Sequence, residues 1–233
     1  SLLSAMNLDV LSTRLGVEIE PQLLELALTH RSYSYEHGNQ PNNERLEFLG
    51  DAVLGFVIAA RVFHTLPDFS EGELSKVTNT VVSARVLAEA ATGLGIGEFL
   101  RLGKGEEGTG GRQKMNLLAD AFEAIIGAAY VSRGMDAAEG IVQRFVFPFL
   151  ENPDAIRANA DPKTNLQEFL QATGKKPHHY EVTHEGPDHE RTFFATLIID
   201  GKEFAEGAGR SKKAAETEAA LVALEKLGYQ GGK

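Results

Sequence analysis

Three acidic residues share one face of an otherwise apolar segment, residues 43–58. Glu44, Glu47 and Asp51 have the spacing i, i+3 and i+7, which places them on the same side of an α-helix. Carboxylates beside an apolar surface are costly to desolvate, and they repel one another unless a positive charge compensates them. These acids therefore need a cationic partner, and a bound metal ion would be one.

A second apolar segment, residues 117–130, repeats the pattern with Asp120 and Glu123 at i and i+3. Two such helices facing each other would gather four or five carboxylates around one point. The chain has no cysteine, so its metal ligands must be oxygen or imidazole, and an oxygen set suits Mg²⁺ or Mn²⁺. The alternative is a solvated stripe, or pairing of the acids with basic residues: Arg31, Arg45, Arg61 or Lys114. Two acidic clusters on two strongly apolar helices favour the metal.

Both segments resemble signatures of the ribonuclease III family. The first reads NERLEFLGD, Asn43 to Asp51, and the second reads LADAFEAII, Leu118 to Ile126. The resemblance implies that Asp51 and Glu123 are the indispensable catalytic acids, and that Glu44 belongs to the outer part of the site. The full set of metal ligands that it implies is Glu44, Glu47, Asp51, Asp120 and Glu123.

The implied reaction is cleavage of double-stranded RNA with Mg²⁺ as cofactor and Mn²⁺ as a possible substitute. Two metal ions roughly 3.5–4 Å apart can activate a water and stabilise the leaving oxygen during in-line attack, so no side-chain nucleophile is needed. His30 is a candidate base, but a single histidine at a helix end is more often structural. The resemblance implies 5′-phosphate and 3′-hydroxyl ends with a short 3′ overhang, and processing of rRNA, mRNA and other structured transcripts.

The family resemblance also implies a homodimer. Phe48 matches an aromatic residue that enters a socket on the partner subunit, and Glu71 matches an acid that shapes this socket. From the residues alone, ordinary core packing would be the better interpretation of Phe48. A solvated loop acid is the alternative for Glu71.

The sequence pattern changes after residue 152. Helical periodicity runs from Leu8 to about Phe149, and a polar segment bounded by Pro153 and Pro162 then reads as a linker. Asp200-Gly201 is typical of a hairpin turn. We expect a helix at 163–173, strands at 180–183, 193–199 and 203–206, the last broken by Gly207-Ala-Gly209, and a helix at 211–227.

This second part resembles a double-stranded RNA-binding domain, which reads duplex shape through three contact regions. Its first helix offers hydrogen-bonding groups to the minor groove, the loop after the first strand offers a second probe, and the start of the last helix attracts phosphate. For Lys212 and Lys213, the two lysines at this helix start, the alternative is a solvated helix end without a ligand. The implied RNA-binding residues are Thr164, Gln167, Glu168, Gln171, Pro187, His189, Arg210, Ser211, Lys212 and Lys213.

Length and composition agree with two domains. The 233 residues include 42% hydrophobic side chains, ordinary for a globular protein. We expect an all-α endonuclease domain at 1–152, a linker at 153–160 and an α+β (α-β-β-β-α) double-stranded RNA-binding domain at 161–233. The sequence contains no apolar run of membrane-spanning length and no signal peptide, so we expect a cytoplasmic protein without membrane contact or small-molecule cofactor.

The net charge of −10 argues against nucleic-acid binding unless basic residues are locally clustered. Residues 1–160 carry 13 basic and 21 acidic side chains, a net of −8, whereas 161–233 carry 10 and 12, a net of −2. A dinucleotide-type glycine pattern at 103–108 is rejected, because no βαβ unit surrounds it, and a mobile surface loop is expected there. Two other functions stay open: a non-catalytic dimeric double-stranded RNA-binding protein, and a helical phosphohydrolase acting on nucleotides.

Overall fold

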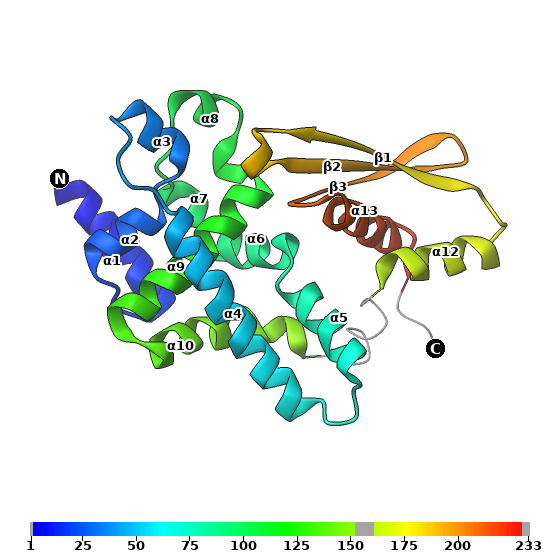
Figure 1. Ribbon diagram of the computed structural model, residues 1–233, viewed down its shortest axis with the longest axis horizontal. Coiled ribbons are helices and arrows are strands. Elements are labelled where there is room, and N and C mark those ends of the chain that lie inside the picture. Colours follow the sequence, from blue (N-terminus) through cyan, green and yellow to red (C-terminus); the bar gives the residue numbers. More distant parts are fainter. Residues whose placement is uncertain (1, 152–160, 230–233) are drawn as a thin grey trace. The chain divides into compact units, whose positions relative to one another are not determined.

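The computed structural model describes residues 2–151 and 161–229 (Figure 1). Its contacts divide the chain into two units. One contains the residues up to Asp68 and Val81–Glu151, and the other contains Phe69–Thr80 and the residues after 160. The proposed linker at 153–160 lies outside the described residues, so the domain limits stay a prediction. Across the part of the chain that is described, no helix is long and apolar enough to cross a membrane.

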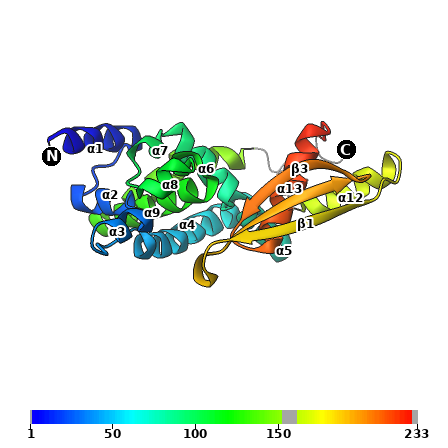
Figure 2. The same ribbon diagram turned by 90° about the horizontal axis from the view of Figure 1, so that it is seen from above.

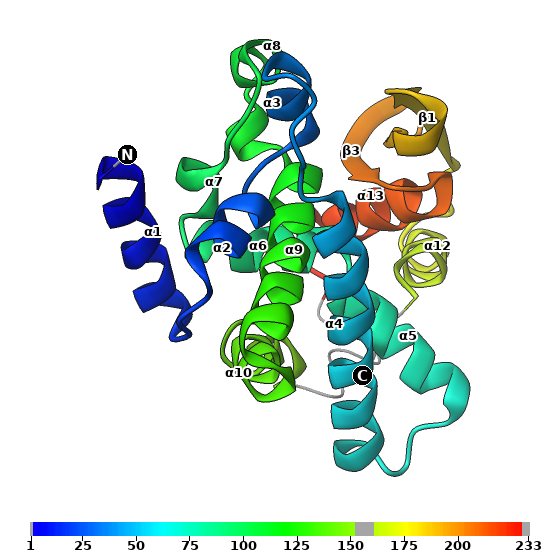
Figure 3. The same ribbon diagram turned by 60° about the vertical axis from the view of Figure 1, so that its left-hand side comes forward.

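The first unit is helical, as the sequence predicts. Helix α9 lies at its centre and packs against α2, α4, α6 and α10 (Figures 1 and 3). The helices before residue 151 are α1 (Leu2–Leu15), α2 (Pro21–Ala27), α3 (Arg31–Glu36), α4 (Glu44–Thr65), α5 (Glu71–Val81), α6 (Ala84–Gly93), α7 (Ile96–Phe99), α8 (Lys104–Gly108), α9 (Met115–Arg133) and α10 (Met135–Phe145), with 3-10 turns at Gly111–Gln113 and Phe147–Leu150. Helix α5 is the one assigned by its contacts to the second unit, up to Thr80.

Helix α4 is buried on one side only, although residues 43–58 are apolar almost all round the helix, a pattern from which a central buried helix is expected. Val53, Leu54 and Ile58 pack inward, whereas Phe48 is 80% exposed and Phe56 63% exposed. An apolar pattern around the whole helix cannot distinguish a core helix from one with an uncovered apolar face. This exposed face is therefore a feature that the sequence pattern hides.

The glycine-rich segment at 103–108 is also different from the expected loop, because it forms helix α8. Glu36 accepts hydrogen bonds from the Lys104 amide, at 2.9 and 3.0 Å. On its other side, Glu107 pairs with Arg112 at 2.7 Å. These contacts fix both ends of a segment whose glycine content alone suggests mobility.

The second unit contains helix α12 (Pro162–Ala172), three strands and helix α13 (Lys212–Lys226). Strands β1 (His178–Glu185), β2 (Thr192–Ile199) and β3 (Lys202–Gly209) form an antiparallel sheet in the order β1-β2-β3 (Figure 2). Asp200 and Gly201 both have positive φ, 53° and 78°, as the predicted hairpin turn requires. The two helices and the inner face of the sheet enclose one core, which includes Leu166, Leu197 and Leu224.

Strand β3 continues through Gly207 and Gly209, which corrects the predicted strand break. A Cβ atom on Gly207 would lie 2.3 Å from the Ala219 nitrogen, and one on Gly209 would lie 2.7 Å from the Ala214 Cβ. The glycines therefore allow α13 to approach the backbone of β3 closely. Their role is close packing rather than strand termination.

Candidate functional site

Helices α4 and α9 touch backbone to backbone. A Cβ atom on Gly50 would lie 1.7 Å from the Glu123 carbonyl oxygen, and one on Gly127 would lie 2.3 Å from the Leu46 carbonyl oxygen. Only glycine permits this approach at both positions. The contact therefore brings the segment before Asp51 directly against the turn that carries Glu123.

The five acids, which we call the acidic site, differ in exposure. Glu44 and Asp51 are exposed, while Glu47 and Asp120 are half-buried. Glu123 is only 1% exposed, and its Oε2 atom accepts no hydrogen bond, although the residue does interact elsewhere within the described structure. Burial of a carboxylate among apolar side chains is costly unless positive charge compensates it.

The side chains of the acidic site do not form a closed set of ligands. Between residues 2 and 151 and after 160, no three Asp, Glu or His side chains are grouped closely enough to hold a metal ion as they stand. The helices thus bring the acidic segments together, while the expected gathering of four or five carboxylates around one point is not seen. Converging carboxylates repel one another, which opposes such a group.

Two of the basic residues considered as alternative partners of these acids are engaged elsewhere. Lys114 pairs with Glu106 at 2.6 Å, and the Arg61 guanidinium lies 4.9 Å from the centre of the Phe147 ring. Neither contact involves an acid of the acidic site, so Lys114 and Arg61 give no support to the ion-pair interpretation.

Asn43 is a positioning residue that the sequence reasoning did not identify. It is 5% exposed, its side chain donates to the Ala27 carbonyl at 3.1 Å, and its carbonyl accepts from the Glu47 amide at 2.8 Å. These bonds anchor the first turn of α4 to the end of α2. The sequence did offer a signal for Asn43, since it is a polar residue directly before an apolar helix.

His30 has a structural role, as the sequence favoured. Its Nδ1 atom accepts from the Ser32 amide at 3.2 Å and caps α3. Burial lowers the pKa of His30 below its usual value; the charge of Glu106 opposes this shift, and those of Arg31 and Lys114 add to it. Beside it, Arg101 binds Glu25 at 2.6 Å and the Tyr33 hydroxyl at 2.8 Å, which joins α2 to α3.

The exposed face of α4 carries a row of large aromatic side chains. Phe48, Phe56 and Phe63 are 80%, 63% and 67% exposed and lie eight and seven residues apart, on one side of the helix. Packing of Phe48 in the core of its own chain is therefore wrong. Glu71 is exposed in the first turn of α5, so it is a helical and not a loop acid.

The predicted minor-groove side chains of α12 are all exposed. Thr164, Gln167, Glu168 and Gln171 point away from a core that contains Leu166 and Leu170. Asp161 caps this helix by accepting from the Thr164 amide, and the hydrogen bonds and nearby Lys76 outweigh burial to lower the pKa of Asp161. The helix thus presents a polar face whose rotation is set by its buried leucines.

The other two predicted contact regions are exposed as well. Lys212 and Lys213 begin α13, and Ser211 caps it by accepting from the Ala214 amide at 3.0 Å. Pro187 and His189 lie in the β1–β2 connection. We call this set of residues, together with exposed Arg210 and the α12 side chains, the duplex-binding face.

A cluster of Lys163, Glu216 and Tyr180 in the second unit was not predicted. Lys163 pairs with Glu216 at 2.7 Å, and its Nζ atom lies 5.0 Å from the centre of the Tyr180 ring. Burial, with the negative charge of Glu216, raises the pKa of Tyr180 to about 12. The three residues join α12, β1 and α13, and no spacing in the sequence indicates that they meet.

Comparison with known proteins gives matches over nearly the whole chain. The family model described as Ribonuclease-III-like matches residues 20–150, and the double-stranded RNA binding motif matches residues 162–227. Ribonuclease 3 of Streptomyces coelicolor is 51% identical over 96% of this chain and 81% of its own length. Ribonuclease 3 of Leifsonia xyli is also 51% identical, over 94% of this chain and 92% of its own length.

The fold of the first unit agrees with solved structures. The nuclease domain of ribonuclease III from Campylobacter jejuni superposes with a TM-score of 0.58 at 38% identity, covering 63% of this chain and 97% of that one. A second structure of that domain, described as flexible in a region involved in dimer formation, gives a TM-score of 0.57 at 39% identity, covering 60% of this chain and 95% of that one. With its nuclease domain and double-stranded RNA binding motif both matched, the chain belongs to the ribonuclease III family.

Proposed function

We propose that this protein is a homodimeric, Mg²⁺-dependent endoribonuclease that cleaves double-stranded RNA and leaves 5′-phosphate and 3′-hydroxyl ends with a short 3′ overhang. The observation that carries the proposal is the burial of Glu123, 1% exposed, where α9 touches α4 at Gly50. Burial of a carboxylate costs free energy, and buried carboxylates are therefore typical of sites where the charge takes part in binding or catalysis. Processing of rRNA and other structured transcripts in the cytoplasm is part of the proposal.

The donor set fits hard divalent cations. Glu47, Asp51, Asp120 and Glu123 offer only carboxylate oxygens, and Glu44 adds a fifth at the exposed rim. Bound Mg²⁺ would supply Lewis-acid stabilisation of charge on the phosphodiester oxygens. The buried Oε2 atom of Glu123 and the half-buried Asp120 are suited to be inner ligands, while exposed Asp51 can meet both a cation and the RNA strand.

The duplex-binding face would hold the substrate. Its α12 amides and hydroxyl match ribose 2′-hydroxyls, and Lys212 and Lys213 match phosphates at a helix start where the dipole also favours anions. Such a face reads duplex shape, so it would favour long helical RNA over particular sequences.

The dimer would form through the exposed aromatic row of α4. Phe48, Phe56 and Phe63 would be costly to leave in water, and a second copy of the chain presents the same row. The relatives from Campylobacter jejuni, in which a region of this domain is involved in dimer formation, support the same arrangement.

The test is incubation of the protein with a long RNA duplex, with and without Mg²⁺, followed by analysis of the ends. We expect cleavage only with the cation, and fragments with 5′-phosphates that a kinase cannot label without prior phosphatase treatment. Binding of duplex without cleavage under any metal condition would instead support the non-catalytic double-stranded RNA-binding function.

A further inference from the structure

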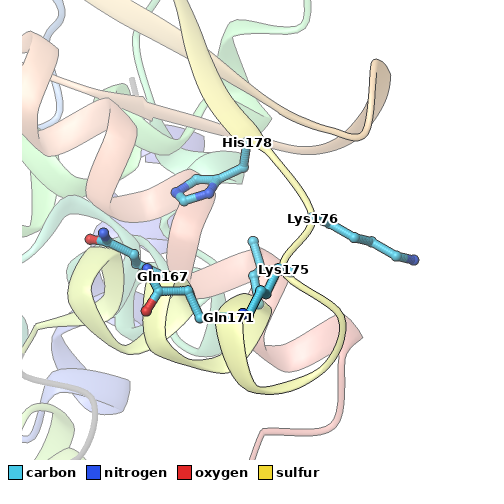
Figure 4. A pocket seen from close by; sticks show the side chains of 6 residues that line it. Gln167, Gln171, Lys175, Lys176 and His178 are labelled. Carbon is cyan, nitrogen blue, oxygen red and sulfur yellow. The ribbon is translucent and has the colours of Figure 1, made fainter.

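A cavity of about 340 Å³ lies at the C-terminal end of α12, where the chain turns into β1 (Figure 4). Leu170 is the apolar residue of its lining. The other lining residues are Gln167, Gln171, Lys175, Lys176 and His178, and the Lys176 side chain extends away from the others towards solvent (Figure 4).

The chemistry of this lining selects a polar anion. None of the described residues that line the cavity is acidic, although the domain as a whole has a net charge of −2. Lys175 and Lys176 are exposed and His178 is half-buried, so their charged or hydrogen-bonding groups can reach a ligand. Phosphodiester oxygens accept hydrogen bonds from ammonium, amide and imidazole groups, whereas a largely apolar ligand would find little matching surface.

The position of the cavity connects it with the duplex-binding face. Gln167 and Gln171 belong to both, so a duplex that meets α12 would pass over the cavity. Strand β1 separates it from the Gly186–His189 loop, and the seven steps from His178 to Glu185 span about 23 Å at roughly 3.3 Å per residue. The cavity thus lies at the opposite end of the domain from that loop.

We propose that Lys175, Lys176 and His178 form a fourth contact region of the domain, which binds backbone phosphates beside the minor groove that α12 enters. This inference rests on the proposed function, because it requires α12 to meet an RNA duplex. It extends the footprint of the domain beyond the three regions of the duplex-binding face.

The competing explanation is that the lysines only stabilise the C-terminus of α12, whose carbonyls attract positive charge. The backbone of Lys175 allows a clean test. Its φ is +53°, a left-handed value that glycine adopts without steric cost, and its amide donates to the Leu170 carbonyl at 2.9 Å. Lys175→Gly therefore removes the ammonium group while keeping the turn.

The experiment measures binding of the full chain, without divalent cations, to an RNA duplex of about 24 base pairs, longer than the roughly 16 that three contact regions span. Lys175→Gly and Lys176→Gln should each reduce the slope of log affinity against log salt by about 0.9, and affinity about fivefold at roughly 0.15 M salt. Lys202→Gln is the matched control, because Lys202 is exposed at the start of β3, at the same end of the sheet, and does not line the cavity.

Thermal melting of the same variants excludes loss of folding as the cause. Salt slopes equal to those of Lys202→Gln would overturn the inference and leave the lysines as helix-end charges. In that case the unaltered chain still binds duplex, and the proposed function stands. Failure of the unaltered chain to bind duplex at any salt concentration would overturn both proposals.

Discussion

The acidic site and the duplex-binding face treat charge in opposite ways. At the acidic site, Glu123 is 1% exposed and the helices around it touch through glycine backbones. On the duplex-binding face, Lys212, Lys213 and Gln167 stand in solvent on helices whose leucines and alanines face a core. The acidic site thus holds one of its charges, that of Glu123, inside the protein, whereas the duplex-binding face displays its charges in solvent.

This difference teaches where single side chains matter. A buried charge interacts strongly in its low-dielectric surroundings, so removing it or moving its helix should have a large effect. Exposed charges are screened by salt, and several of them would contact the RNA together, so each contributes little to the free energy of binding. The following predictions test that contrast, in order of decreasing effect.

Removal of one buried or adjacent carboxylate should abolish cleavage. We expect Glu123→Gln and Asp51→Asn to lower the cleavage rate by about a thousandfold or more, which is about 4 kcal/mol, because each change keeps the volume and removes a ligand charge. Duplex affinity and melting temperature should be retained. Glu89→Gln, an exposed acid on α6, is the control; normal cutting by either site variant would remove that residue from the acidic site.

Separation of the two helices should be nearly as damaging. Gly50→Ala places a methyl group 1.7 Å from the Glu123 carbonyl oxygen, so we expect a loss of about 3 kcal/mol in unfolding free energy, measured by denaturant titration, together with reduced cleavage. Gly55→Ala in the same helix meets no atom within 4 Å and should raise stability by up to about 1 kcal/mol. Equal effects of the two changes would mean that the close contact is unimportant.

Deletion of residues 161–233 should weaken duplex binding without abolishing cleavage. We expect the remaining chain to be a dimeric nuclease whose duplex affinity is lower by about a hundredfold near physiological salt, because the duplex is no longer tethered. At low salt it should recover much of its cleavage activity, as gel assays can show. Lack of any metal-dependent cleavage at low salt and high concentration would show that the second domain contributes to the acidic site itself.

The dimer should be sensitive to one aromatic side chain. Phe48→Ala should weaken self-association by about thirtyfold, or about 2 kcal/mol, seen as a concentration-dependent shift in sedimentation. Val10→Ala trims another exposed apolar residue, 46% exposed on α1, and should leave the dimer unchanged. A normal dimer formed by the Phe48 variant would place the interface elsewhere.

The smallest effects should be pH dependences of the free energy of unfolding, with opposite signs in the two units. Tyr180 has a pKa of about 12 in the folded protein, against an ordinary value near 10. Its contribution to the free energy of unfolding, at most about 2 kcal/mol after allowance for partial exposure, is therefore present below pH 10 and lost between about pH 10 and 12. The pKa of His30 is lowered, so its contribution is present above about 6.5 and lost as the pH falls.

Hydrogen exchange measured separately in each unit would test these signs. Tyr180→Phe should remove the alkaline loss of protection in the second unit, and His30→Asn, which keeps a capping side chain, should remove the acidic loss in the first. A loss of protection that both variants retain would assign the pH dependence to other groups.

The sequence by itself determined the elements and their chemistry. Spacing placed Glu44, Glu47 and Asp51 on one helix face, and Asp200-Gly201 gave the hairpin turn, because both features depend on local geometry within a few residues. Two long motifs also sufficed to indicate the family. Residues 161–233 have a net charge of −2, and Lys212 and Lys213 could still be identified as phosphate contacts because they lie at the start of a helix.

Only the tertiary structure decided which faces are covered and which residues meet. It left Phe48 exposed, extended β3 through Gly207, turned the glycine-rich segment into α8, and brought Lys163, Tyr180 and Glu216 together. It also kept the side chains of the five acids from forming a closed group, although their helices touch. Each of these outcomes depends on the packing of segments distant in the chain, and periodicity reports only what a segment could bury, not what it meets.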